Sequence, residues 1–295
     1  MKILLTGANG FVGAWLAREI LHSGHELLAT GSGNCRLPFT GDPLFRYAQM
    51  ELLDPISIRE NCQHFGPDMI IHSGAMSRPD ECVMNKDLAY AVNVRSTKSL
   101  LAQADQLKSR FLFLSSDFVF DGESGPYKEE DTPAPVNYYG QTKYEAEKLV
   151  RGYPYEWSIV RTILVFGKPI VPRSYLLSIV ENKLRKGEEY LLVNDQVRTP
   201  TYVGDLVSGI MEIVKRKAAG IFHLSGENKM TPYEMGCELA RLLGLNEQLL
   251  KPVNAAVFKE PARRPARTSF ILDKAKKELD YRPHSFLAAL RETLR

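Results

Sequence analysis

Short apolar runs alternate with longer amphipathic stretches along the first two-thirds of the chain. Apolar runs of about four to eight residues indicate buried strands, and an apolar period of about 3.6 residues indicates helices. Near-continuous apolar strands that alternate with helices are typical of a parallel sheet covered on both faces, so we predict an α/β fold with a doubly wound, Rossmann-type sheet. The strands are expected at 3–5, 25–30, 68–72, 111–114, 157–164 and 221–224, and the helices at 11–22, 54–64, 85–107, 138–151 and 205–215.

The segments from about 168 to 201 and from about 226 to the end follow a different pattern, in which helices are joined by proline-rich connections. One of these helices is capped by Thr231-Pro232-Tyr233-Glu234, a segment that predicts a capping box with proline in the first turn. We therefore predict two domains. The Rossmann domain comprises 1–167 and 202–225, and a smaller, discontinuous α/β substrate-binding lobe comprises 168–201 and 226–295.

Composition narrows the class of protein. With 295 residues, 44% of them hydrophobic and 25% charged, the chain is long enough to bury a large core. Its net charge of +3 is far below the excess of a nucleic-acid binder, so no nucleic-acid partner is expected. No apolar run approaches the length of a membrane span, and Met1-Lys2 leads directly into the first predicted strand, so we expect a cytoplasmic protein without a membrane partner. The four cysteines lack metal-ligand spacing, which indicates reduced structural thiols and no metal.

A glycine-rich turn follows the first predicted strand. Gly7, Gly10 and Gly13 lie between that strand and the helix at 11–22. Glycines let the backbone approach a pyrophosphate closely, and the N-terminus of a helix attracts its charge. An ordinary strand-to-helix turn is the alternative, but the position between an N-terminal apolar strand and an amphipathic helix favours a dinucleotide site.

Tyr139 and Lys143 are four residues apart in a predicted helix, and Ser116 ends a predicted strand. Residues four apart share a helix face, although such pairs also occur by chance on solvated helices. Reduction of a ketone places negative charge on its oxygen, so the site needs a proton donor and a second hydrogen bond. We predict that Tyr139 donates the proton and that Ser116 supplies the second bond. At about 4 Å, Lys143 would lower the pKa of Tyr139 toward neutrality, and it would also bind the nicotinamide ribose.

The choice of cofactor depends on the end of the second strand, where NAD enzymes place a carboxylate on the adenine ribose. Here Gly31 and Ser32 carry no carboxylate, and Arg36 follows in the same loop. A hydroxyl and a guanidinium suit a 2′-phosphate, so we predict that NADP(H) is preferred, with NAD(H) left open. The alternative is a flexible loop whose arginine faces water.

Several motifs together resemble the extended short-chain dehydrogenase/reductases and, within them, the dTDP-4-dehydrorhamnose reductase family. The resemblance covers nearly the whole chain. The chain departs from that family's pattern in two places. Ser116 stands where the family usually has Thr, and this change keeps the hydroxyl. The family's usual His-Thr-x-Val-Asp-x-x-Glu stretch corresponds to 76–83, which lacks the glutamate. The similar segments are Thr6-Gly7-Ala8-Asn9-Gly10-Phe11-Val12-Gly13, Ser115-Ser116-Asp117-Phe118-Val119-Phe120-Asp121-Gly122, Tyr139-Gly140-Gln141-Thr142-Lys143, Asp195-Gln196, Pro200-Thr201 and Arg264-Pro265.

The resemblance implies roles for further residues. Asn93 is similar to a helix asparagine near the catalytic lysine, with tolerance on a polar helix face as the alternative. Arg198 and Arg264 would clamp a substrate diphosphate, whereas a solvated basic surface at Arg263, Arg264 and Arg267 is the alternative. The implied cofactor-binding residues are Gly7, Asn9, Gly10, Phe11, Val12, Gly13, Ser32, Arg36, Leu52, Tyr139 and Lys143, and the implied substrate-binding residues are Asp117, Arg198 and Arg264.

The resemblance implies an NADPH-dependent reductase of a nucleotide-linked 4-keto sugar, most similar to dTDP-4-dehydrorhamnose reductases of dTDP-L-rhamnose biosynthesis. A nucleotide-sugar epimerase on the same fold is one alternative. A non-catalytic NADP-binding regulator that resembles the methionine adenosyltransferase beta subunit is another. A dehydratase is disfavoured because it usually needs an acidic pair, and Phe118 rather than Glu follows Asp117. A homodimer is left open.

Overall fold

The structure is a computed structural model that describes residues 1–294, and its centre is one parallel sheet. Within these residues the sheet has seven strands in the order β3-β2-β1-β4-β5-β6-β10. The order reverses at β1, as in a doubly wound fold, so the predicted fold class is confirmed. The strands are β1 (Lys2–Thr6), β2 (Glu26–Gly31), β3 (Phe45–Gln49), β4 (Met69–His72), β5 (Arg110–Ser116), β6 (Trp157–Thr162) and β10 (Gly220–His223).

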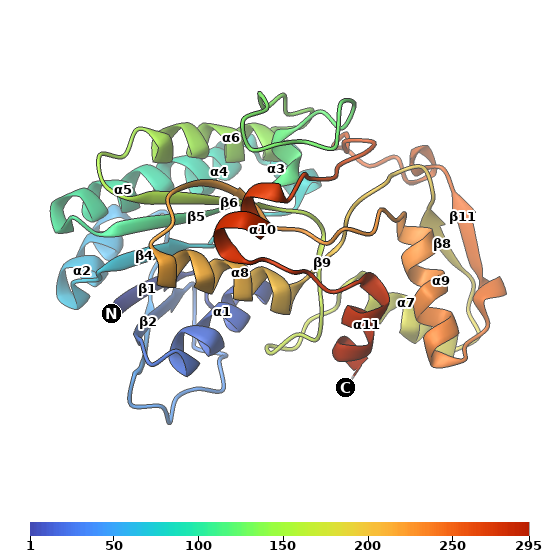
Figure 1. The fold of residues 1–295 in the computed structure, drawn as a ribbon, viewed down its shortest axis with the longest axis horizontal. Helices are drawn as coiled ribbons and strands as arrows, with labels where there is room; N and C mark the ends of the chain where they lie inside the picture. Colours follow the sequence, from blue (N-terminus) through green and yellow to red (C-terminus); the bar gives the residue numbers. More distant parts are fainter. Residues whose placement is uncertain (295) are drawn as a thin grey trace.

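Helices cover both faces of this sheet (Figure 1). Successive side chains of a strand point to opposite faces, and β1 shows this directly. Ile3 and Leu5 are buried in the core under one helical layer, whereas Leu4 is buried in the core under the other. The first layer contains α1 (Phe11–His22), α8 (Val203–Arg216) and α10 (Asp273–Leu279), and the second contains α2 (Pro55–Phe65), α5 (Ser96–Leu107) and α6 (Tyr138–Arg151).

Two parts of the predicted pattern are corrected. Strand β3 was not predicted, because this edge strand is only half-buried and shows no apolar run. The single helix predicted at 85–107 begins earlier and is interrupted. It consists of α3 (Pro79–Met84), α4 (Lys86–Tyr90), a π-helical turn (Ala91–Arg95) and α5, with Pro79 opening the first piece. A π turn inside a helix often marks a functional site.

A smaller group of elements lies to the right of the sheet in Figure 1. Its own apolar core includes Val180, Leu192 and Leu239. The capping box predicted for its central helix is confirmed, because Thr231 N donates to Glu234 Oε2 (2.7 Å) and Glu234 N donates to Thr231 Oγ1 (3.2 Å). The elements are α7 (Leu176–Arg185), α9 (Pro232–Leu243), α11 (Phe286–Leu294) and a two-stranded parallel sheet of β8 (Tyr190–Val193) and β11 (Leu250–Val253).

The division into two domains stays a proposal. A short parallel pair, β7 (Val165–Phe166) and β9 (Thr201–Tyr202), lies where the chain leaves and re-enters the sheet region. Helix α10, which we assigned to the smaller lobe, packs on α8 and β10. The remaining short 3₁₀ turns are Asp117–Val119, Glu247–Leu249 and Ala255–Phe258.

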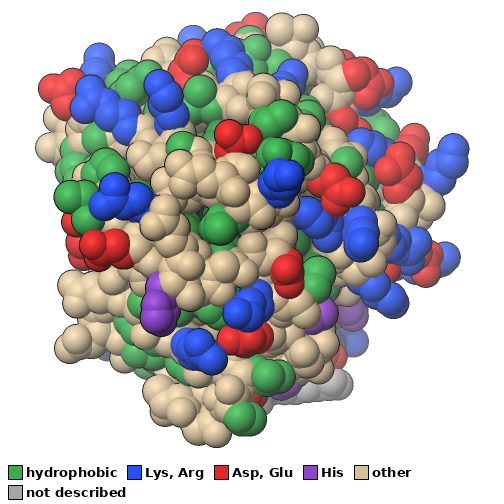
Figure 2. All heavy atoms as spheres, turned by 90° about the vertical axis from the view of Figure 1, so that its left-hand side faces the viewer, with side chains coloured by type: hydrophobic (Ala, Val, Ile, Leu, Met, Phe, Trp, Pro, Cys, Tyr) green, Lys and Arg blue, Asp and Glu red, His purple; other side chains and the backbone are tan. Residues whose placement is uncertain are grey.

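The surface carries charges of both signs. On the face shown in Figure 2, basic and acidic side chains are interspersed rather than gathered in a patch of one sign. Among residues 1–294, no helix is long and apolar enough to cross a membrane.

Candidate active site

A cleft of about 780 Å³ brings together the residues that follow β1, β2, β4 and β5. In doubly wound folds a ligand binds at the carboxyl ends of the strands, where the strand order reverses. Of the predicted catalytic, cofactor-binding and substrate-binding residues, Leu52 alone does not line this cleft. It is partly buried and packs against the core beside the backbone of Gly74. The predicted residues in the lining are Gly7, Asn9, Gly10, Phe11, Val12, Gly13, Ser32, Arg36, Ser116, Asp117, Tyr139, Lys143, Arg198 and Arg264.

The glycine turn leaves room for a phosphate at the N-terminus of α1. Gly7 has a φ of +69°, and a Cβ built there would lie 2.7 Å from Gly74 Cα, so only glycine fits. The N-cap of α1 is Gly10, which makes no side-chain capping bond, and the first turn contains no acidic residue. The first amide groups of α1 are therefore open to an anion, and these residues fit a pyrophosphate.

Asn9 connects this turn to the loop after β2. Its side chain accepts a hydrogen bond from Arg36 N (3.0 Å) and donates to Asn34 O (3.0 Å) and Tyr47 Oη (2.9 Å). The side chains of Ser32 and Arg36 are exposed at the cleft wall. The sequence did not identify Tyr47, because it lies on the unpredicted strand β3. The contact of Ser32 and Arg36 with a 2′-phosphate stays a prediction.

Ser116 is held at the end of β5, where it caps a 3₁₀ turn. Its Oγ accepts a hydrogen bond from Phe118 N (3.2 Å) and donates to Asp117 Oδ1 (3.0 Å). Helix α6 approaches this turn closely through Gly140, where a Cβ would lie 2.0 Å from Phe118 O. This close approach brings Tyr139 to Ser116, and their hydrogen bond acts to lower the pKa of Tyr139.

We predicted that Lys143 would lower the pKa of Tyr139 toward neutrality, but the pKa of Tyr139 is raised instead. Both side chains are buried, and removal from water disfavours the charged form of each. Burial therefore raises the pKa of Tyr139 and lowers that of Lys143 to about 7. Lys143 Nζ donates to Leu114 O (2.5 Å) and lies 3.9 Å from the centre of the Phe113 ring.

Asn93 is not merely tolerated on a polar helix face, as the alternative supposed. It is buried in the π-helical turn. Its Oδ1 accepts from Met76 N (2.8 Å), and its Nδ2 donates to Met76 O (3.0 Å) and Thr142 Oγ1 (2.9 Å). Asn93 thus ties the chain after β4 to helix α6 beside Lys143, a contact that spacing along the sequence does not reveal.

Asp117 is a buried carboxylate at the inner end of the cleft. Its Oδ2 accepts from Thr268 Oγ1 (2.5 Å) and lies 3.9 Å from Arg198 Nε. Burial raises the pKa of Asp117 above its usual value. Arg198 is itself 5% exposed and donates to Pro265 O (2.5 Å) and Ala266 O (3.2 Å). The loop at 265–266 therefore fixes this guanidinium beside Asp117.

The guanidinium of Arg264 is also bound by carboxylate groups of the protein. Its Nη1 and Nη2 donate to the two carboxylate oxygens of Asp80, both at 2.7 Å, and its Nε lies 3.0 Å from Glu260 Oε2. Only Arg263 and Arg267 of the predicted basic cluster are exposed, so the solvated-surface alternative is wrong for Arg264. Both clamp candidates line the cleft, but protein acceptors already occupy most of their donors. Their contact with a diphosphate stays a prediction.

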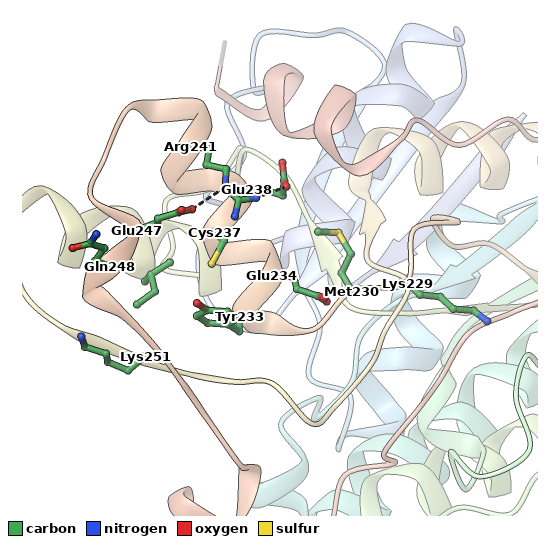
Figure 3. Close-up of a pocket in the computed structure, with 11 residues that line it drawn as sticks. Lys229, Met230, Tyr233, Glu234, Cys237, Glu238, Arg241, Glu247, Gln248 and Lys251 are labelled. Carbon is green, nitrogen blue, oxygen red and sulfur yellow. Dashed lines mark hydrogen bonds and ion pairs between the residues drawn. The ribbon is translucent and has the colours of Figure 1, made fainter.

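A second hollow of about 650 Å³ lies on α9 and β11 and contains none of the predicted site residues (Figure 3). Its central cation, Arg241, is paired with Glu238 (3.0 Å) and Glu247 (2.8 Å). Tyr233 and Cys237 line the same hollow.

Nothing in residues 1–294 forms a group of three or more side chains suited to hold a metal ion. The four cysteines are free, and three of them are buried. Burial raises the pKa of the Cys62 thiol to about 12 and that of Cys82 to about 11, so both are protonated at neutral pH.

Known proteins similar to this chain carry names of two kinds, reductase and methionine adenosyltransferase subunit. The family described as RmlD substrate binding domain matches residues 1–295. Methionine adenosyltransferase 2 subunit beta of Xenopus tropicalis is 31% identical over 85% of this chain and 75% of that protein. A Haloferax volcanii protein named "Probable low-salt glycan biosynthesis reductase Agl14" is 30% identical over 95% of this chain and 92% of that protein. The solved structure of a dTDP-4-dehydrorhamnose reductase from Clostridium acetobutylicum has a TM-score of 0.86 at 27% identity, covering 100% of this chain and 98% of the other.

Proposed function

The chain belongs to the RmlD substrate binding domain family, and on that premise we propose that it is an NADPH-dependent reductase of a nucleotide-linked 4-keto sugar. Within that class we propose a dTDP-4-dehydrorhamnose reductase of deoxysugar biosynthesis. One observation carries the proposal: Ser116, Tyr139 and Lys143 line the same cleft as the open glycine turn. Similarity to the Haloferax volcanii protein, which is named a reductase, and to the Clostridium acetobutylicum dTDP-4-dehydrorhamnose reductase supports it.

The residues of this cleft have distinct tasks in the proposed reaction. A bound nicotinamide supplies the hydride to the ketone carbon. Tyr139, whose raised pKa keeps its proton in place at neutral pH, donates that proton to the ketone oxygen. Ser116 supplies the second hydrogen bond by turning its hydroxyl from Asp117 to the same oxygen. Lys143 holds the ribose and so orients the nicotinamide.

The test is a panel of dTDP-, UDP- and GDP-linked 4-keto sugars, with NADPH oxidation followed by absorbance. We expect stoichiometric oxidation of NADPH with one nucleotide class, and the dTDP sugar is the first candidate. An epimerase would instead recycle its bound cofactor, so product would form without net NADPH consumption. Absence of turnover on every sugar, together with tight NADPH binding, would contradict the proposed enzyme.

A regulator is the second candidate, because the methionine adenosyltransferase 2 subunit beta of Xenopus tropicalis is 31% identical over 85% of this chain. A regulator would bind NADPH without oxidising it and would change the activity of a purified methionine adenosyltransferase. The catalytic trio in the cleft favours the reductase. Adding the chain to such an enzyme, with and without NADPH, separates the two functions.

NADPH is the cofactor we propose, and replacement of Arg36 tests this choice. NADPH should bind at least about tenfold more tightly than NADH, because a charge-assisted bond contributes about 1.5–3 kcal/mol. Arg36→Ala should reduce that preference while leaving NADH affinity unchanged, since only NADPH carries the 2′-phosphate. Calorimetry on both dinucleotides measures the effect.

Arg46→Ala is the matched control, because this exposed arginine pairs with Glu26 (3.2 Å) and does not line the cleft. It should leave both affinities unchanged. Equal or tighter binding of NADH by the unmodified protein would contradict the choice of NADPH.

A further inference from the structure

Among residues 1–294, the cleft contains one guanidinium that is free of protein acceptors. Four arginines line it: Arg36, Arg173, Arg198 and Arg264. Arg36 Nη2 donates to Asn9 O (3.4 Å), and the two candidates for the diphosphate clamp are bound as described above. Within the described part of the chain, no hydrogen bond or ion pair engages the guanidinium of Arg173. This group contacts the Phe11 ring, whose centre lies 5.9 Å from Cζ.

Contacts with α1 hold the segment that carries Arg173. At the beginning of this segment, Trp15 Nε1 donates to Lys168 O (2.9 Å). At its end, the Tyr175 ring stacks on the Phe11 ring with centres 6.3 Å apart and an interplanar angle of 15°. Tyr175 is also the N-cap of α7. The connection between β7 and α7 is therefore fixed along α1 at both ends, with Arg173 between them.

These contacts place Arg173 at a defined end of the cleft. Phe11 is the first residue of α1 and directly follows the uncapped Gly10. The open amide groups of this helix end are where a dinucleotide pyrophosphate binds. Arg36 lies instead on the loop after β2, and Arg198 and Arg264 face Asp117 and Asp80. Of the four arginines, Arg173, which has no protein acceptor among residues 1–294, is thus the one that lies beside the expected pyrophosphate position.

We propose that Arg173 binds the pyrophosphate of the dinucleotide and positions the cofactor from the small-lobe side of the cleft. The inference rests on the proposed function, because it requires a dinucleotide at the glycine turn. A guanidinium forms paired hydrogen bonds with phosphate oxygens, which an ammonium does not reproduce. Because Arg173 is exposed, its attraction to the anion weakens as salt is added. The sequence showed no motif at this position.

The experiment compares the binding of NADPH and NADH to the full-length protein by calorimetry. Arg173→Ala should weaken the binding of NADPH and of NADH by about tenfold each, because both dinucleotides carry the pyrophosphate. Arg36→Ala should weaken only NADPH, so the two arginines give different patterns. Arg173→Lys should recover part of the loss, and Arg173→Ala should also reduce the salt dependence of the dissociation constant. Arg95→Ala is the matched control, because this exposed arginine contacts Tyr90 outside the cleft.

Each result decides the inference. Unchanged NADPH and NADH affinities in Arg173→Ala, with normal binding by the unmodified protein, would overturn the role of Arg173 and leave the proposed function intact. If the unmodified protein binds neither dinucleotide, both proposals fail. Calorimetry with dTDP covers a further outcome. If Arg173→Ala weakens the binding of dTDP but not that of NADH, the guanidinium belongs to the sugar-nucleotide site and the inference is wrong. A thermal unfolding midpoint equal to that of the unmodified protein excludes a folding defect.

Discussion

Replacing Tyr139 with phenylalanine is expected to lower turnover by about 100-fold to 10,000-fold, the usual range for loss of a general acid. The change removes one hydroxyl from a buried ring that packs edge-on against Phe118, so the packing of α6 is kept. NADPH affinity should change little, since the phenol acts on the ketone. Steady-state turnover with the nucleotide sugar, beside calorimetry with NADPH, measures both quantities.

The neighbouring tyrosine provides the control for this prediction. Tyr138→Phe removes the same hydroxyl from a ring that contacts Lys86 and does not line the cleft. Its turnover should equal that of the unmodified protein. Full activity in Tyr139→Phe would show that another group donates the proton, and equal losses in both variants would point to a general disturbance of α6.

Burial also shifts the pKa of Lys143, the residue one helical turn after this acid. With a pKa of about 7, Lys143 carries its charge mainly below neutral pH. Glu147, one turn further along α6, acts to raise that pKa. The ammonium interacts with the Leu114 carbonyl and the Phe113 ring rather than with water. Burial, which the spacing of Tyr139 and Lys143 does not reveal, thus reverses the pKa shift expected from charge alone.

The sequence predicted the features that are encoded locally. Strands β1, β4 and β5 are buried on both faces and therefore appear as apolar runs, and the helix at 138–151 has the observed bounds. The glycine turn was recognised from its spacing, which the close approach of Gly13 to Gly7 requires: a Cβ at Gly13 would lie 2.1 Å from Gly7 O. Strand β3 was missed because an edge strand needs no continuous apolar run.

Pairings between distant residues could not be predicted. Arg264 meets Asp80 across 184 positions, and Arg198 meets carbonyl groups about 67 positions away. Neither partner follows from a motif, so the predicted diphosphate clamp treated both guanidinium groups as free. Arg173 has the opposite property: it lies in no motif, and only its place beside Phe11 distinguishes it from other exposed arginines.

Replacing Glu147 is expected to destabilise the fold by about 3–5 kcal/mol, because it leaves the buried guanidinium of Arg161 without its carboxylate partner. Glu147 and Arg161 both have 0% exposed side-chain surface. The carboxylate accepts from Arg161 Nε (3.0 Å) and Nη2 (2.7 Å) and from Ser115 Oγ (2.6 Å). It therefore joins α6, β6 and β5 directly beneath Ser116. Equilibrium unfolding of Glu147→Ala in urea measures the loss.

The exposed pair on the same helix is the matched control. Glu145 and Lys148 lie 2.8 Å apart with about half of each side chain exposed, so Glu145→Ala should change the free energy of unfolding little. The double variant Glu147→Leu with Arg161→Met gives the sharper test. Replacing a buried pair by apolar residues of similar size is often neutral, so the double variant should be more stable than Glu147→Ala. If the double variant is the least stable of the three, the cost comes from lost packing rather than from an unpaired charge. In that case the ion pair itself contributes little to joining β6 to β5 and α6, the two elements that carry the catalytic side chains.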